Sequence, residues 1–297
     1  MNLKQILYFL QIYRDESFTK AAANLAVTQP ALSLQIAQLE KELGFSLLDR
    51  NPGRIEVTGK GKTFLIHAVD ILDSFQNLEN ALKQNTGQPM LPEQLNIAAG
   101  GAICAWVLPD VIGKLKQSYP DVRINILEGD RNFIRHTLLT GRSDYTISTE
   151  KIHDHRIESR YFCSDRIVPV IAVKSRAPGD LKSLKDFPVL FYHSGSSIQN
   201  IVEERLIKLN LHGKLNVVME LHSLISLIKS VEAGLGIGFI SELSKSTAIK
   251  ILTIEDLYCQ RKFYIYYRKK RSAALSETAA ELANIAQKLP NIRQPDY

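Results

Sequence analysis

Residues 15–40 read DESFTKAAANLAVTQPALSLQIAQLE, and this stretch decides the fold of the first part of the chain. Ser17 is a suitable N-cap for one helix. Thr28 is a suitable N-cap for the next, with Pro30 in its first turn, where a missing N–H costs little. Apolar residues then recur at helical spacing until Gly44 ends the pattern. The side chains expected to face the core from this second helix are Leu32, Ile36, Leu39 and Leu43.

The segments on either side complete a winged helix-turn-helix, which we place at residues 1–58. A helix is predicted over about residues 3–13, and a tight turn followed by a short strand is predicted at residues 50–57. The second helix of the pair in such a motif enters the major groove of double-stranded DNA. The residues predicted to lie nearest to the base edges are Thr28, Gln29, Pro30, Ser33 and Leu34.

Two arginines at the wing are also predicted to contribute to DNA binding. Arg50 and Arg54 flank its turn, where they can meet phosphates or the minor groove. A simpler interpretation stays open for both, since basic surface residues are usually just solvated. It stays open as well for Gln29 and Ser33, which can serve only to cap and solvate their helix.

The same N-terminal stretch closely resembles that of LysR-type transcriptional regulators. The resemblance continues through Leu43-Gly44, Leu47-Leu48-Asp49-Arg50 and Thr58-Gly59-Lys60-Gly61. It departs from the usual pattern at Leu48, where phenylalanine is habitual, and at Lys60, where a small residue is usual. Weaker landmarks of the family's effector-binding region follow in the right order, namely Val107-Leu108-Pro109, Tyr119-Pro120-Asp121-Val122, Gly141-Arg142-Ser143-Asp144 and Ala233-Gly234-Leu235-Gly236-Ile237-Gly238.

The resemblance implies a sequence-specific transcription regulator in the cytoplasm, and not an enzyme. It implies a homodimer or homotetramer on double-stranded promoter DNA with dyad symmetry, a small-molecule effector, and contact with RNA polymerase. We expect no cofactor. The alternative is a small-molecule enzyme or a solute-binding protein that carries an incidental helical N-terminal domain.

A helix pattern over residues 59–88 predicts a linker that pairs with a second copy of the chain. Its apolar residues alternate in steps of four and three, which is the seam of a coiled coil. The seam residues are Phe64, Ala68, Ile71, Phe75, Leu78 and Leu82. The alternative is a helix that lies on its own domain. The position of the seam between the DNA-binding module and a break at residues 87–92 favours the dimer.

From residue 94 onward strands alternate with helices, which predicts an α/β module with mostly parallel sheets. The predicted strands are residues 95–99, 122–127, 145–148, 167–173, 189–192, 215–221, 237–240 and 263–267. A module of about 200 residues favours two subdomains around a cleft over one sheet, an arrangement like that of periplasmic binding proteins. In this α+β multidomain chain we place the first subdomain at residues 89–165 and 269–297, and the second at residues 166–268.

The effector site is predicted at the turns that follow the strands of this module. Its residues are Gly100, Gly101, Ala102, Thr149, Ser196 and Ser197. Backbone N–H groups at helix starts, together with hydroxyls, favour an anion, so we expect a small anionic effector. Two alternatives stay open. Small side chains in the first loop, where the family often has hydroxyls, leave room for a bulkier and less polar molecule, and all six residues can be ordinary helix caps.

Composition narrows the remaining choices. The net charge of +6 lies wholly in residues 89–297, because residues 1–88 contain nine basic and nine acidic residues, so the DNA prediction rests on pattern. Cys104, Cys163 and Cys259 are far apart and fit a reducing compartment, with neither a disulfide framework nor a metal site. No stretch has the length of a membrane span.

The glycines at residues 234–238 follow a predicted helix and lead into a strand, which indicates helix termination and close packing instead of a nucleotide fold.

Overall fold

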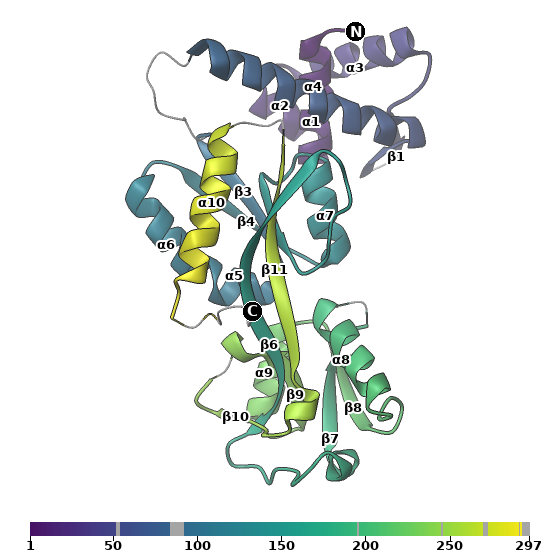
Figure 1. The fold of residues 1–297 in the computed structure, drawn as a ribbon. Helices are drawn as coiled ribbons and strands as arrows, with labels where there is room; N and C mark the ends of the chain where they lie inside the picture. The colour runs from purple at the N-terminus through teal and green to yellow at the C-terminus, as the bar shows by residue number, and fades with distance from the viewer. Residues whose placement is uncertain are drawn as a thin grey trace.

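Three large hydrophobic cores organise the residues that the computed structural model describes, which are 1–51, 54–83, 92–194, 196–244, 246–269, 273–290 and 292. One core holds the N-terminal helices together, and we call it the N-terminal core. The other two lie in the α/β module. In Figure 1 the N-terminal module lies at the top, a long helix crosses the view, and the α/β module extends downward.

The N-terminal module consists of three helices, as the sequence predicts, and a two-stranded ribbon whose second strand lies within the predicted residues 50–57. Asn2 caps the first helix by accepting a hydrogen bond from Gln5 N at 2.9 Å, and the Gln5 side chain accepts one from Asn2 N at 3.0 Å. The ribbon pairs antiparallel, with Leu48 opposite Val57, and its predicted turn at residues 52–53 lies outside the described residues. The elements are α1 (Leu3–Asp15), α2 (Phe18–Asn24), α3 (Gln29–Leu43), β1 (Leu48–Asn51) and β2 (Arg54–Val57).

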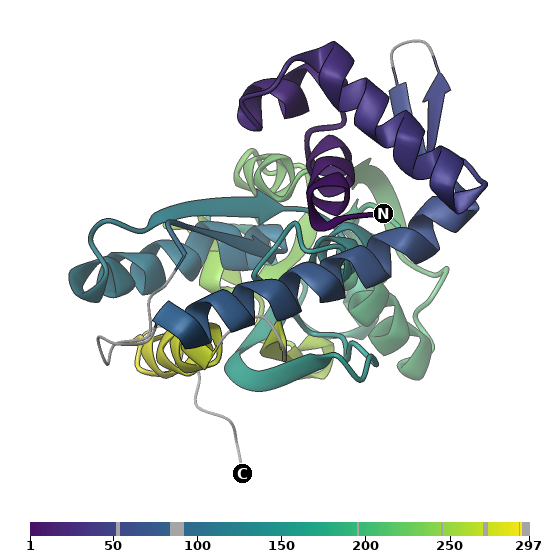
Figure 2. The same cartoon turned by 90° about the horizontal axis from the view of Figure 1, so that it is seen from above.

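The linker is one long helix, α4 (Gly59–Lys83), which lies across the end of the α/β module in the view of Figure 2. Gly61 allows its first turn to approach the wing, since a β-carbon there would lie only 2.1 Å from Leu47 O. Residues 84–91, where the sequence predicts the end of the linker and much of the break, lie outside the described residues. Of the helices in the described ranges, none combines the length and the apolarity needed to cross a lipid bilayer.

The described part of the α/β module contains a nine-stranded sheet covered by helices. Its strands are β3 (Gln94–Ala99), β4 (Arg123–Glu128), β5 (Tyr145–Ser148), β6 (Ile157–Ala172), β7 (Pro188–Tyr192), β8 (Asn216–Leu221), β9 (Ile237–Ser241), β10 (Ile249–Ile251) and β11 (Cys259–Arg268). Its helices are α5 (Gly101–Trp106), α6 (Leu108–Ser118), α7 (Arg131–Leu139), α8 (Ser197–Lys208), α9 (Leu224–Glu232) and α10 (Ala273–Gln287), with short 3-10 turns η1 (Lys182–Asp186), η2 (Glu242–Ser244) and η3 (Glu255–Leu257).

The sheet is mixed and continuous, which corrects the expectation of mostly parallel and separate sheets. The strand order is β4-β3-β5-β11-β6-β9-β7-β8, and β10 pairs with β6. Parallel pairing is confined to β3 with β4 and β5, and to β7 with β8 and β9. The long strands β6 and β11 pair antiparallel from Ile167 opposite Cys259 to Ile157 opposite Arg268, and they join the two halves. The sequence did not predict residues 157–166 as a strand because polar and charged residues dominate them.

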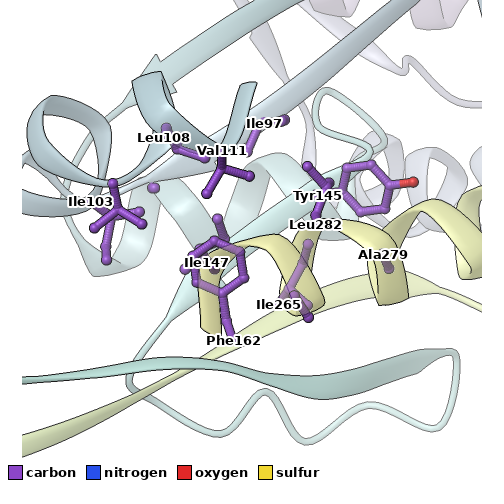
Figure 3. Close-up of a cluster of buried hydrophobic side chains, with 14 of the residues drawn as sticks. Ile97, Ile103, Leu108, Val111, Tyr145, Ile147, Phe162, Ile265, Ala279 and Leu282 are labelled. Atoms are coloured by element: carbon purple, nitrogen blue, oxygen red, sulfur yellow. The ribbon is translucent and has the colours of Figure 1, made fainter. Parts of the chain in front are cut away.

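Two separate cores nevertheless divide this module into the expected two subdomains. The chain leaves the first core between Cys163 and Ile167, and it returns between Cys259 and Phe263. The return therefore lies closer to the start of β11 than the predicted boundary at residue 268, because the second half of β11 packs in the first core. Figure 3 shows side chains of that first core, among them Ile103, Val111, Tyr145, Phe162, Ile265 and Leu282.

The glycines at residues 234–238 end a helix and allow close packing, as their position after a helix predicts. Gly234 follows α9 with φ of 82°, a left-handed conformation that glycine adopts without strain. A β-carbon at Gly236 would lie 2.6 Å from Pro188 O on the neighbouring strand. These glycines thus place β9 against β7.

Candidate functional site

Helix α3 is held with one face in the N-terminal core and its end against the wing. Thr28 Oγ1 accepts a hydrogen bond from Ala31 N at 3.4 Å at the start of the helix. Glu40 accepts hydrogen bonds from Leu47 N at 2.7 Å and from Leu48 N at 3.1 Å, which fixes the entry into β1. The fully buried side chains of α3 are Leu32, Ile36 and Leu39. Core and wing together therefore decide which face of α3 points outward.

The outward surface at the start of α3 carries the residues that the sequence predicts to contact DNA. Thr28, Gln29, Pro30 and Leu34 are exposed, and Ser33 is half-buried. Leu34 is 66% exposed, so its side chain contributes little to the core of this chain. The side chains of Arg50 and Arg54 lie outside the described residues. The five helix residues share an accessible surface, and their contact with DNA stays a prediction.

Helix α4 has two apolar faces, and the predicted seam is divided between them. Phe64 packs edge-on against Phe9 with ring centroids 5.0 Å apart, and Ala68 is buried in the N-terminal core, so these two residues pack within their own chain. The remaining seam residues are exposed, namely Ile71, Phe75, Leu78 and Leu82. The face of α4 buried in the N-terminal core also includes Leu65, Val69 and Leu72. Of the six predicted seam residues, the four from Ile71 to Leu82 are thus available to a second chain.

The N-terminal module and α4 are fastened to the α/β module by polar contacts. Asp73 on α4 forms a buried ion pair with Arg268 at the end of β11, with 2.7 Å between Asp73 Oδ2 and Arg268 Nε. Glu16 and Arg142 form an exposed pair at 3.3 Å. The Tyr13 hydroxyl also contacts His136 on α7. These contacts join α1 and α4, which pack in the same core as α3, to the first α/β subdomain.

A cavity of about 370 Å³ opens between the two α/β cores. Its apolar wall includes Ile103 and Phe263 from the first core and Ile198 and Leu224 from the second. All six residues predicted for the effector site line this cavity, which are Gly100, Gly101, Ala102, Thr149, Ser196 and Ser197. They follow β3, β5 and β7, so the structure brings three distant turns together. Their role in binding stays a prediction.

The start of α8 forms the wall that carries the serines. Ser196 is buried, and its Oγ accepts a hydrogen bond from Gln199 N at 3.0 Å, so it is an N-cap. The side chain of Gln199 turns back and accepts a hydrogen bond from Tyr192 N at 3.2 Å. The capping role uses an acceptor lone pair of Ser196. Its hydroxyl hydrogen and the N–H groups of Ser197 and Ile198, at the start of the helix, remain as donors of this wall.

Sequence patterns missed several polar and aromatic residues of the same cavity. They are Glu128, Asp130, Arg131, Glu150, Tyr192, His193, His222 and Arg261. The position at the end of a strand could have identified some of these residues. Glu128 and Tyr192 are the last residues of β4 and β7, and ligands of open α/β sheets bind beyond the carboxyl ends of the parallel strands. His222 directly follows β8.

Both arginines of the cavity are already paired with carboxylates of the protein. Arg131 forms an ion pair with Glu150. Arg261 is buried and pairs with Asp165, with 2.8 Å between Arg261 Nε and Asp165 Oδ1. The Ser241 hydroxyl donates to Asp165 at 2.6 Å. Neither arginine therefore brings an uncompensated positive charge to the cavity.

The three cysteines are buried and free. Burial, together with the charge of Glu128, raises the pKa of Cys104 to about 12, and burial also raises the pKa of Cys163. The thiolate is the reactive form of cysteine, so buried thiols of this kind are unreactive at neutral pH. Within the described ranges, no three histidine, cysteine, aspartate or glutamate residues form a group suited to a metal ion.

Comparison with known proteins agrees with this division of the chain. The pattern of the bacterial regulatory helix-turn-helix protein, lysR family, matches residues 3–62, and that of the LysR substrate binding domain matches residues 91–287. A probable RuBisCO transcriptional regulator from Thalassiosira pseudonana is 30% identical over 280 residues, which are 89% of this chain and 90% of the relative.

Two solved structures share the fold across the whole chain. A full-length variant of OxyR from Pseudomonas aeruginosa has a TM-score of 0.82 at 20% identity and covers 100% of this chain and 99% of its own. Full-length LysG from Corynebacterium glutamicum, with bound effector Arg, has a TM-score of 0.64 at 19% identity and covers 99% of this chain and 100% of its own. The N-terminal module and the two-subdomain module thus define a DNA-binding regulator with an effector-binding domain. The chain belongs to the LysR family of transcription regulators.

Proposed function

We propose that α3 reads promoter DNA through Thr28, Gln29, Pro30, Ser33 and Leu34, with Arg50 and Arg54 on the backbone or in the minor groove. Support comes from the exposed surface at the start of α3 and from the capping that sets its position. Gln29 can pair with adenine, Ser33 can donate or accept a hydrogen bond, and Leu34 can contact a thymine methyl group. The two arginines position the module without reading sequence.

The proposed assembly is a homodimer through α4, and a pair of such dimers forms a homotetramer. The exposed residues Ile71, Phe75, Leu78 and Leu82 support the dimer, because the opposite face of the same helix is already buried in its own chain. A regulator assembled in this way acts in the cytoplasm, on an operator with dyad symmetry, and it acts on RNA polymerase at the promoter.

The cavity between the subdomains is proposed as the effector site, and the convergence of the six predicted residues on it carries this proposal. An anionic group of the effector binds at Ser196, Ser197 and Thr149, where the start of the twelve-residue helix α8 offers N–H groups and hydroxyls. A bound arginine in the LysG structure supports a small molecule as the type of effector. The effector shifts the balance between two arrangements of the dimers and so alters the bend of the DNA.

Titration calorimetry of the full-length protein against a panel of metabolites tests this site. A compound with a carboxylate should bind, and Ser196→Ala/Ser197→Ala should weaken it about tenfold, the usual value of a charge-assisted hydrogen bond. Ser230→Ala, at a serine on α9 outside the lining of the cavity, is the matched control and should leave binding unchanged. Equal affinity of all three proteins for every compound that binds would move the site away from this cavity.

A further inference from the structure

Glu128 brings a carboxylate to the cavity without a partner of opposite charge. It is the last residue of β4 and lies against the wall formed by the turn after β3, since a β-carbon on Gly101 would come within 2.8 Å of Glu128 Oε1. In the part of the chain that the structure describes, no side chain forms an ion pair or a hydrogen bond with this carboxylate. The wall at Gly100, Gly101 and Ala102, where the sequence suggested an anion, thus already carries a negative charge of the protein.

Neighbouring charges do not neutralise Glu128. The two arginines of the cavity are paired with Glu150 and Asp165. The carboxylate of Asp130 caps α7 by accepting a hydrogen bond from Phe133 N at 2.8 Å, and it adds a second negative charge to the same side. This side of the cavity is therefore complementary to a positive charge and repels a purely anionic ligand.

Aromatic rings form the facing wall. His193 and His222 are stacked with ring centroids 4.9 Å apart and an interplanar angle of 5°, and Tyr192 lies 4.8 Å from His193. Burial, and then the charge of Glu128, raise the pKa of Tyr192, so its phenol stays neutral at physiological pH. Glu128 and Tyr192 both line the cavity, so the carboxylate and this wall border the same space. A carboxylate beside aromatic rings is an arrangement that binds organic cations.

We propose that the effector of this chain is a small zwitterion whose cationic nitrogen, an ammonium or a guanidinium, pairs with Glu128 beside Tyr192, while its anionic group binds at the start of α8. An amino acid has both groups at a spacing that fits a cavity of about 370 Å³. The inference rests on the proposed function of the cavity as the effector site. It makes Glu128 the residue that selects the charge of the effector.

The test is calorimetry of the full-length protein with three matched sets of probes. These are the twenty protein amino acids, the amines that lack their carboxylate, and the carboxylic acids that lack their amino group. For the wild type, at least one amino acid should bind, and removal of its amino group should weaken binding about tenfold or more, as for a lost charge-assisted hydrogen bond. In Glu128→Gln that difference should fall to about twofold or less, while Glu158→Gln, at an exposed glutamate on β6 outside the cavity, should behave like the wild type.

Other results would overturn the inference, and they differ in whether the cavity remains the effector site. If carboxylic acids without an amino group bind as tightly as the amino acids, and Glu128→Gln tightens them while Ser196→Ala/Ser197→Ala weakens them, the zwitterion is wrong and the effector site stands. If neither variant changes the affinity of any probe that binds, the inference fails and the cavity is not the effector site. If no probe binds, the inference alone fails.

Discussion

Arg268 and Asp73 form a buried ion pair that fastens the end of β11 to the linker helix α4. Arg268 Nε donates to Asp73 Oδ2 at 2.7 Å, and another nitrogen of the same guanidinium donates to Leu138 O at 2.7 Å. The opposite half of β11 carries Arg261 and Phe263, which line the cavity. One strand therefore reaches from the proposed effector site to the helix that leads into the DNA-binding module.

Loss of one partner of this pair should destabilise the protein strongly. Asp73→Ala leaves the buried guanidinium of Arg268 without its carboxylate, and such a loss costs about 3–5 kcal/mol. Urea unfolding of the full-length protein measures the effect. The double variant Asp73→Leu/Arg268→Met removes both charges and should recover most of the loss. A free energy of unfolding of Asp73→Ala within about 0.5 kcal/mol of the wild type would mean that the pair is not closed in solution.

A charge on the exposed half of the α4 seam should dissociate the dimer. Leu78→Asp places a carboxylate where the proposed interface excludes water, and it costs the protomer little because Leu78 is 56% exposed. Sedimentation velocity should show a monomer, and affinity for the operator should collapse, while the circular dichroism spectrum stays unchanged. Thr63→Asp, at an exposed residue of the same helix outside the seam, should remain a dimer. An intact Leu78→Asp dimer that binds DNA normally would contradict the assignment.

The thiols should resist alkylation in the native protein. The pKa of Cys104 is about 12, so at pH 7.5 this residue carries almost no thiolate, and burial blocks access to all three cysteines. Iodoacetamide should label the native chain only slowly, and all three positions should react in 6 M urea. Rapid labelling of a single cysteine before unfolding would instead indicate a reactive thiol of the kind that senses peroxide.

The N-terminal module was predictable because local signals determine it. Ser17 and Thr28 cap the helices that they were expected to cap, and Leu32, Ile36 and Leu39 are buried at helical spacing. Helical spacing alone does not predict the burial of Leu7, which shares a helical face with Leu3 and Leu10 and yet has a side chain that is 40% exposed. The burial of such a residue depends on what packs against the helix, and a periodic pattern does not carry that information.

The cavity was predictable from strand ends but its charge was not. Turns after β3, β5 and β7 were identified because parallel strands gather their carboxyl ends at one place. The strands before Glu128 and His222 were predicted as well, at residues 122–127 and 215–221, but the site was assigned only to turns with small or hydroxyl-bearing residues. The sequence also does not show which arginines are paired with carboxylates, because Arg261 meets Asp165 only through the pairing of β11 with β6.

The central claim is that the exposed start of α3 reads a specific promoter sequence. DNase footprinting and filter binding of the full-length protein, on the DNA upstream of its own gene and on random DNA of equal length, test it most directly. The wild type should protect a stretch with dyad symmetry, and Leu34→Ala should lose about 1–3 kcal/mol of discrimination between the two DNAs. Leu235→Ala, at a leucine of the α/β module that is 47% exposed, should leave the footprint unchanged. Equal affinity of the wild type for upstream and random DNA, or a wild-type footprint from Leu34→Ala, would contradict the claim.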